Sequence, residues 1–148
     1  MEVETHRLEV STRGDDHVVD LTRMVVSALA TGSIRDGLAC VFVVGSTAAI
    51  TTTEYEPGLA THDLAAALER LAPRDGRYLH EETWHDDNGH AHVRASFIGP
   101  SLTVPLIGGR LALGQWQQIV LIDSDTRTRR RDIVVQVLGG GLEQPRGG

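Results

Sequence analysis

Four of the seven histidines lie close together in the sequence, at His80, His85, His90 and His92. His90 and His92 open a segment, Ala91–Ile98, whose alternating residues predict a β-strand. Side chains two apart in a strand share a face, with Cα atoms about 6.5–7 Å apart. Two imidazoles could therefore converge on one metal ion, and His80 could join them from the preceding loop. The alternative interpretation is a solvated, turn-rich loop whose histidines bind nothing.

The same predicted face continues with Arg94 and Ser96, whereas Val93, Ala95 and Phe97 would point to the core. A face carrying imidazole, guanidinium and hydroxyl groups can hold a metal and also clamp an anion such as phosphate. Three imidazoles (His80, His90 and His92) favour Zn²⁺ or Ni²⁺ over Mg²⁺, although Mg²⁺ stays open as a second choice.

Other candidate residues surround the β-branched run that ends at Thr53. Glu54 follows this run and could act as a general base or metal ligand, or simply belong to a hydrophilic turn. Ser46 and Thr47, after Gly45, could offer backbone N–H groups to an anion. Cys40 lies inside an apolar run, which favours a small core residue over a catalytic thiol.

The composition limits the classes of function. The chain has 148 residues, 41% hydrophobic and 4% aromatic, so one domain with an aliphatic core is expected. A net charge of −6 argues against a nucleic-acid partner or an anionic membrane surface. All 14 cationic residues are arginine, which excludes Schiff-base and P-loop lysine chemistry. The single cysteine and the charged N-terminus indicate a cytoplasmic protein with no membrane segment.

The hydrophobic pattern predicts an α+β fold in one domain over residues 1–140, with largely antiparallel sheet and two main helices. Residues 141–148 are expected to form a disordered tail. Helices are predicted from Asp16 or Asp20 to Gly32 and from Thr61 to Leu71. Strands are predicted at Val3–Ser11, Leu38–Val44 (buried on both faces), Thr47–Thr53, Ala91–Ile98, Ser101–Leu106, Arg110–Leu113, Trp116–Asp123 and Asp132–Leu138. The run Arg127–Arg131 is expected to be a solvated hairpin end.

The stretch Ser101–Ile119, SLTVPLIGGRLALGQWQQI, is similar to the signature of the YjbQ family, also called secondary thiamine-phosphate synthases. The matching residues are Ser101, Val104, Leu106, Gly109, Gly114, Trp116, Gln117 and Ile119, whereas Gln115 replaces the usual threonine. Tyr78-Leu79-His80 and Ala91-His92-Val93 resemble two further family motifs. Much of the family has His-Thr-Ser/Thr-Ala where this chain has Gly45-Ser46-Thr47-Ala48, so the chain resembles a distinct branch without that histidine. Its third site partner would then be His90, His85, Glu54 or water.

The resemblance implies a compact α+β domain that assembles as a homotrimer, with sites near the subunit boundaries. It also implies weak thiamine-phosphate synthase activity, which joins hydroxymethylpyrimidine pyrophosphate to thiazole phosphate. With such a phosphorylated substrate, Arg94 and a divalent metal on His80, His90 and His92 would neutralise the leaving pyrophosphate. Glu54 would move a proton. Two alternatives stay open: a zinc-dependent hydrolase of a small substrate, and a non-catalytic trimer that binds a metal or small ligand.

Overall fold

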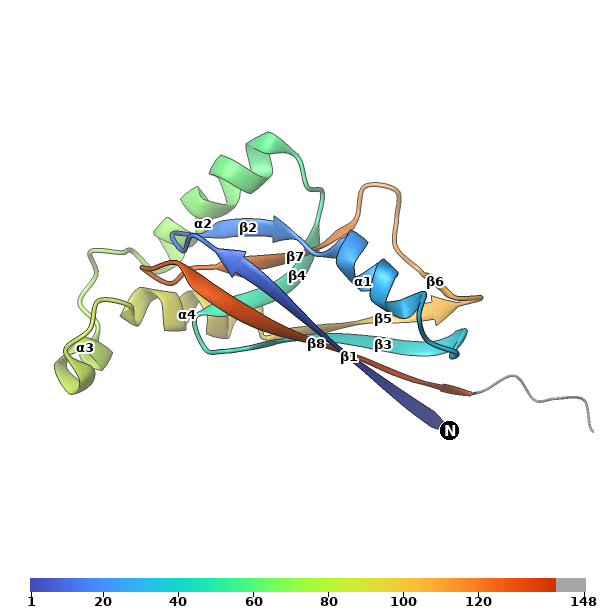
Figure 1. Ribbon diagram of the computed structural model, residues 1–148. Helices are drawn as coiled ribbons and strands as arrows, with labels where there is room; N and C mark the ends of the chain where they lie inside the picture. The colour runs from blue at the N-terminus through green and yellow to red at the C-terminus, as the bar shows by residue number, and fades with distance from the viewer. Residues whose placement is uncertain (141–148) are drawn as a thin grey trace, which may run out of the picture.

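The computed structural model describes residues 1–140, which form two antiparallel sheets and a few helices (Figure 1). The five-stranded sheet has the order β1-β8-β3-β5-β6, and the three-stranded sheet has the order β2-β7-β4. The strands are β1 (Glu2–Thr12), β2 (His17–Asp20), β3 (Asp36–Val44), β4 (Ala48–Thr53), β5 (Ser101–Ile107), β6 (Arg110–Leu111), β7 (Gln118–Asp123) and β8 (Arg129–Gly140). The helices are α1 (Thr22–Leu29), the π-helix η1 (Leu59–Asp63), α2 (Leu64–Leu71), α3 (Leu79–Trp84) and α4 (Gly89–Ile98). The predicted α+β class and antiparallel sheets are confirmed.

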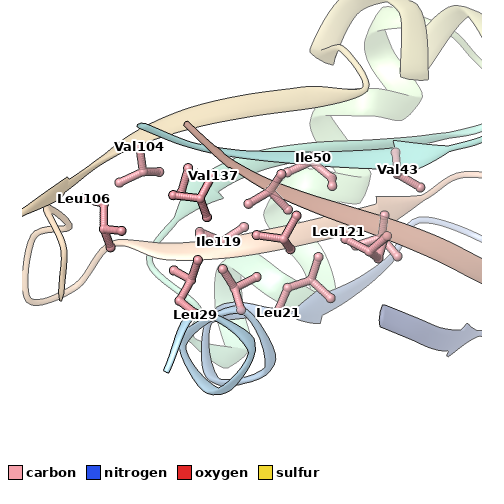
Figure 2. Close-up of a cluster of buried hydrophobic side chains, with 14 of the residues drawn as sticks. Leu21, Leu29, Val43, Ile50, Val104, Leu106, Ile119, Leu121 and Val137 are labelled. Carbon is pink, nitrogen blue, oxygen red and sulfur yellow. The ribbon is translucent and has the colours of Figure 1, made fainter. Parts of the chain in front are cut away.

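The main core lies between the two sheets and α1. Alternating residues of β3 and β8 point inward, and β7 is buried from Ile119 to Asp123 because it is the central strand of the small sheet. Figure 2 shows Val43, Val104 and Val137 from the large sheet facing Ile119 and Leu121 of β7. Leu21, just before α1, and Leu29, at the end of α1, pack against the same cluster. These branched aliphatic side chains supply the core that the low aromatic content requires.

The first and last strands of the described chain pair with each other. β1 and β8 run antiparallel in an unbroken register from Glu2 opposite Gly139 to Thr12 opposite Arg129. β8 also pairs with β3, from Asp36 opposite Gly140 to Val44 opposite Asp132. β8 is therefore an interior strand of the large sheet, and β1 forms one of its edges.

The segment predicted as the strand Ala91–Ile98 is instead the helix α4, and that prediction is wrong. The buried residues of α4 are Gly89, His90, Ala91, Arg94 and Ala95, which follow helical spacing. Because His90 and Arg94 are polar, the sequence pattern hides the buried face of the helix. α3 and β2 are further elements that the pattern did not predict.

β3 is buried on one face only, whereas its continuous apolar sequence predicts burial on both. Leu38, Phe42 and Val44 are 51%, 39% and 49% exposed on its outer face. Leu138 of β8, which is paired with Leu38, is also exposed on that side. The outer side of the large sheet thus presents an apolar strip, defined here as Leu38, Phe42, Val44 and Leu138.

Within residues 1–140, no helix is long and apolar enough to cross a membrane. The predicted tail, residues 141–148, lies outside the described part of the chain.

Candidate functional site

Two of the predicted site histidines meet at one end of the molecule. The rings of His80 on α3 and His92 on α4 have their centroids 4.4 Å apart and are tilted by 53°. His80 Nε2 lies 3.3 Å from Asp86 Oδ2. α3 lies at the edge of the molecule beside α4 (Figure 1), and the short connection between them carries Asp86. α3, the short connection and α4 therefore form a helical hairpin that brings His80 and His92 together.

His92 is held between groups with opposing electrostatic effects. Burial lowers the pKa of His92 below its ordinary value of 6.5, and the neighbouring His80 lowers it further. The carboxylates of Asp86 and Asp125 and a hydrogen bond to the Ser46 backbone act in the opposite direction. The net lowering keeps the His92 ring neutral at pH 7, in the form that can accept a proton. The arrangement can therefore serve as a proton acceptor and donor through His92 and its neighbour His80.

His90 does not join this pair. Residues two apart on an α-helix point about 200° apart, so His90 turns into the interior and is only 1% exposed. Its Nδ1 atom is buried without a hydrogen-bond partner among the described residues. Tyr78 lies close by, with ring centroids 6.3 Å apart. Burial, followed by the charges of Arg94 and Arg74, lowers the pKa of His90.

The predicted metal centre of three imidazoles is therefore not assembled. Among residues 1–140, no group of three histidine, cysteine, aspartate or glutamate side chains is placed to hold a metal ion. The donor set thus does not fit the Zn²⁺-like or Mg²⁺ site expected from the sequence, and we derive no step through a metal.

Arg94 is also directed inward rather than toward a ligand. Its Nη1 donates to Asp16 Oδ2 at 2.6 Å, its Nη2 donates to Glu69 Oε2 at 2.5 Å, and both Nε and Nη2 donate to the Ala72 carbonyl oxygen. The side chain is 4% exposed. All three nitrogen atoms are engaged, so Arg94 fixes α4 to α2 and to the β1–β2 turn. The strand that would have placed Arg94 beside His90 and His92 does not exist.

A second buried ionic cluster lies where β4, β7 and β8 meet. Arg131 donates from Nε and Nη2 to the two oxygens of Asp123 at 2.7 and 2.8 Å. Thr47 Oγ1 accepts a hydrogen bond from Arg131 Nη2 and donates to Asp125 Oδ2. Hydrogen bonds from Thr47, Arg129 and Thr126 lower the pKa of Asp125 against the opposing effect of burial. Asp125 thus remains a carboxylate near His92.

The sequence interpretation missed this cluster because Arg131 was assigned to a solvated basic run. A signal was nevertheless present. Arg131 is in phase with Ile133, Val135 and Val137, the buried positions of β8, so strand periodicity alone directs its side chain inward.

The remaining predicted residues fall into different places. Thr47 is buried in the cluster just described, whereas Ser46 is exposed and contacts His92 through its backbone. Glu54 is exposed at the far end of β4. Seven positions separate it from Thr47, which is about 23 Å of extended chain at about 3.3 Å per residue. His85 is exposed and ends α3 in the left-handed conformation, with φ 55°.

The comparisons with known proteins agree with this architecture. The family model described as UPF0047 protein YjbQ-like matches residues 6–140. A UPF0047 protein of Methanothermobacter thermautotrophicus is 39% identical over 139 residues, covering 94% of each chain. A UPF0047 protein of Mycobacterium tuberculosis is 39% identical over 140 residues, covering 93% of this chain and all of the relative. A crystal structure of a hypothetical protein from Aeropyrum pernix superimposes with a TM-score of 0.85 at 35% identity, covering 93% of this chain and 99% of the other.

Proposed function

Because the chain belongs to the UPF0047 (YjbQ-like) family, we propose that it binds a phosphorylated small molecule beside His80 and His92 and has weak thiamine-phosphate synthase activity. The observation that carries this proposal is the contact between the two imidazoles, 4.4 Å apart and backed by Asp86. The resemblance implies such a pair around a small polar site. It also implies the reaction, which nothing in the geometry identifies by itself.

In this reaction the thiazole nitrogen forms a bond to the methylene carbon of the pyrimidine. The carbon–oxygen bond to pyrophosphate breaks, and its electron pair leaves with pyrophosphate. Charge therefore develops on the leaving oxygens, where hydrogen-bond donors stabilise the transition state. We assign the donor role to protonated His80, which would donate from Nδ1 because its Nε2 atom faces Asp86, and we assign to His92 the role of sharing the proton.

Two residues expected at the site are left out of this mechanism. Arg94 is saturated by its own partners, and Glu54 lies at the opposite end of β4. In this mechanism, the histidine pair takes over charge stabilisation from Arg94 and proton transfer from Glu54.

We also propose that the chain assembles as a homotrimer, as the resemblance implies. The apolar strip of the large sheet supports association, because exposed apolar residues in neighbouring register are buried when two copies meet. Phe97, which is 69% exposed on α4, is a further exposed apolar side chain on the helix that carries His92.

The test of the synthase activity is a turnover assay with hydroxymethylpyrimidine pyrophosphate and thiazole phosphate. Wild-type protein is expected to form thiamine phosphate above the level of the His80→Ala/His92→Ala variant. His62→Ala is the matched control, because His62 is exposed on the separate helix η1. Equal product from wild type and the double variant would remove the synthase proposal.

Measurements distinguish the two alternatives from the synthase. A non-catalytic trimer would use the same histidine pair to bind a phosphorylated ligand, but it would show no turnover. A zinc-dependent hydrolase needs a metal centre that residues 1–140 do not assemble. A stoichiometric metal in untagged protein, lost in His92→Ala, would restore that second alternative.

A further inference from the structure

One edge of a buried guanidinium is left open beside the histidine pair. Arg131 is 8% exposed, and its Nε and Nη2 atoms make the hydrogen bonds to Asp123 and Thr47 described above. Its Nη1 atom has no hydrogen-bond partner within residues 1–140. Nη1 points at Gly45, where a β-carbon would lie only 2.9 Å away.

Gly45 keeps this edge uncovered. Its φ of +146° is a conformation that residues with a side chain rarely adopt, and any side chain there would meet the guanidinium. Gly45 and the next residue, Ser46, are exposed. Among the described residues, the N–H groups of both lack a hydrogen-bond acceptor. The turn also borders a pocket of about 180 Å³ together with Ala95 and Ser96 of α4.

The same turn lies beside the histidine pair, because the Ser46 backbone is close enough to the His92 ring to raise its pKa. The carboxylates beneath the turn are compensated. Asp123 is bound by Arg131, and Asp125 is bound by Arg129 and Thr47. The unused donors at this place are therefore Nη1 and two backbone N–H groups, a set that suits the several oxygens of an oxyanion.

We propose that the Gly45–Ser46 turn and Arg131 Nη1 bind the phosphate or pyrophosphate end of the substrate, next to His80 and His92. This inference rests on the proposed function, since it divides the same site into an oxyanion subsite and a proton-transfer pair. The subsite belongs to the branch with Gly45, because the histidine that much of the family carries at this position would meet Arg131 Nη1.

Titration of the full-length wild-type protein with inorganic pyrophosphate tests the proposal. In ¹⁵N–¹H spectra, the amide signals of Gly45 and Ser46 and the side-chain Nε–H signal of Arg131 are expected to shift and saturate together. Calorimetry is expected to give a dissociation constant at least about tenfold weaker for Gly45→Ala. Gly108→Ala is the matched control: Gly108 also has a positive φ, of +57°, but an added β-carbon there meets nothing within 4 Å.

Saturating shifts that map elsewhere, or no shifts up to about 10 mM pyrophosphate, would overturn the proposal, as would unchanged binding by a folded Gly45→Ala. If that variant does not fold, the wild-type signals decide. A protein that makes thiamine phosphate through His80 and His92 but shows no shift at this turn keeps the proposed function and loses the oxyanion subsite. A protein with the expected shifts and no turnover keeps the subsite and loses the synthase.

Discussion

Arg94 and Asp16, separated by 78 positions in the sequence, form a buried ion pair with 2.6 Å between Nη1 and Oδ2. Asp16 belongs to the turn after β1, and its other oxygen accepts a hydrogen bond from Ser124 Oγ beyond β7. The pair thus joins α4, which carries His92, to both sheets. The position of His92 depends on this anchoring.

Replacing Arg94 by leucine is expected to destabilise the fold by about 3–5 kcal/mol, because the carboxylate of Asp16 would remain buried without its cation. Urea unfolding followed by circular dichroism measures the change. Arg130→Leu is the control, since it removes an exposed pair with Glu9 and is expected to change stability little. An equally small loss of unfolding free energy in the two variants would mean that the Arg94–Asp16 pair does not stabilise the fold.

Acid is expected to destabilise the fold through His90 and His92. The pKa of each is lowered by burial, so the unfolded chain, titrating near 6.5, binds more protons than the folded chain at pH values between 6.5 and the lowered pKa values. The free energy of unfolding should therefore fall as the pH drops from 6.5 toward the lowered values, whereas above 6.5 these two groups contribute no slope. Urea midpoints measured between pH 7 and about pH 5 test the sign.

His90→Leu should flatten this acid limb. It removes one of the titrating groups together with the unpartnered Nδ1 atom, so stability at neutral pH is expected to stay level or rise. The same substitution at exposed His62 should leave the curve as in wild type. An acid limb that persists unchanged in His90→Leu would contradict the assignment.

Thr47→Val should weaken the buried cluster without changing the shape of the side chain. The variant loses the hydroxyl that accepts from Arg131 and donates to Asp125, at an expected cost of about 1–3 kcal/mol. Thr51→Val serves as the comparison, because Thr51 lies in the adjoining strand β4, is half-buried and makes no side-chain hydrogen bond among residues 1–140. An equal and small effect at both positions would show that the Thr47 bridge contributes nothing.

Phe42→Asp is expected to lower the molecular mass measured by light scattering at micromolar concentration from a trimer toward a monomer. A carboxylate placed in the apolar strip would have to be buried without a partner when copies associate. Leu71→Asp, at an exposed apolar residue of α2, should leave the mass unchanged. Wild-type protein that is already monomeric would refute the trimer.

Hydrophobic patterning predicted β5 and β8 because aliphatic side chains recur at their alternating buried positions, and it predicted β3 from its continuous apolar run. It failed at α4, where His90 and Arg94 occupy the buried face and make a helix resemble an alternating strand. Polar residues can be buried there only because Asp16, Glu69 and Ala72 supply partners. Those partners come from distant parts of the sequence, which a local pattern cannot contain.

The candidate site was predictable only in part. The density of histidines pointed to the region where His80 and His92 meet, and the motifs of the family resemblance contain His80 and His92 rather than His90. The helical geometry that separates His90 from His92 and the inward direction of Arg131 required the three-dimensional arrangement.

The pairing of β1 with β8 has a consequence for how the molecule is made. Residues 2–12 are synthesised well before their partner strand, residues 129–139. β1 therefore has no partner strand until β8 has emerged from the ribosome, and loop closure over such a span is slow. A nascent chain released before that point lacks both β8 and Arg131, so its large sheet has neither its edge pairing with β1 nor the ion pair with Asp123.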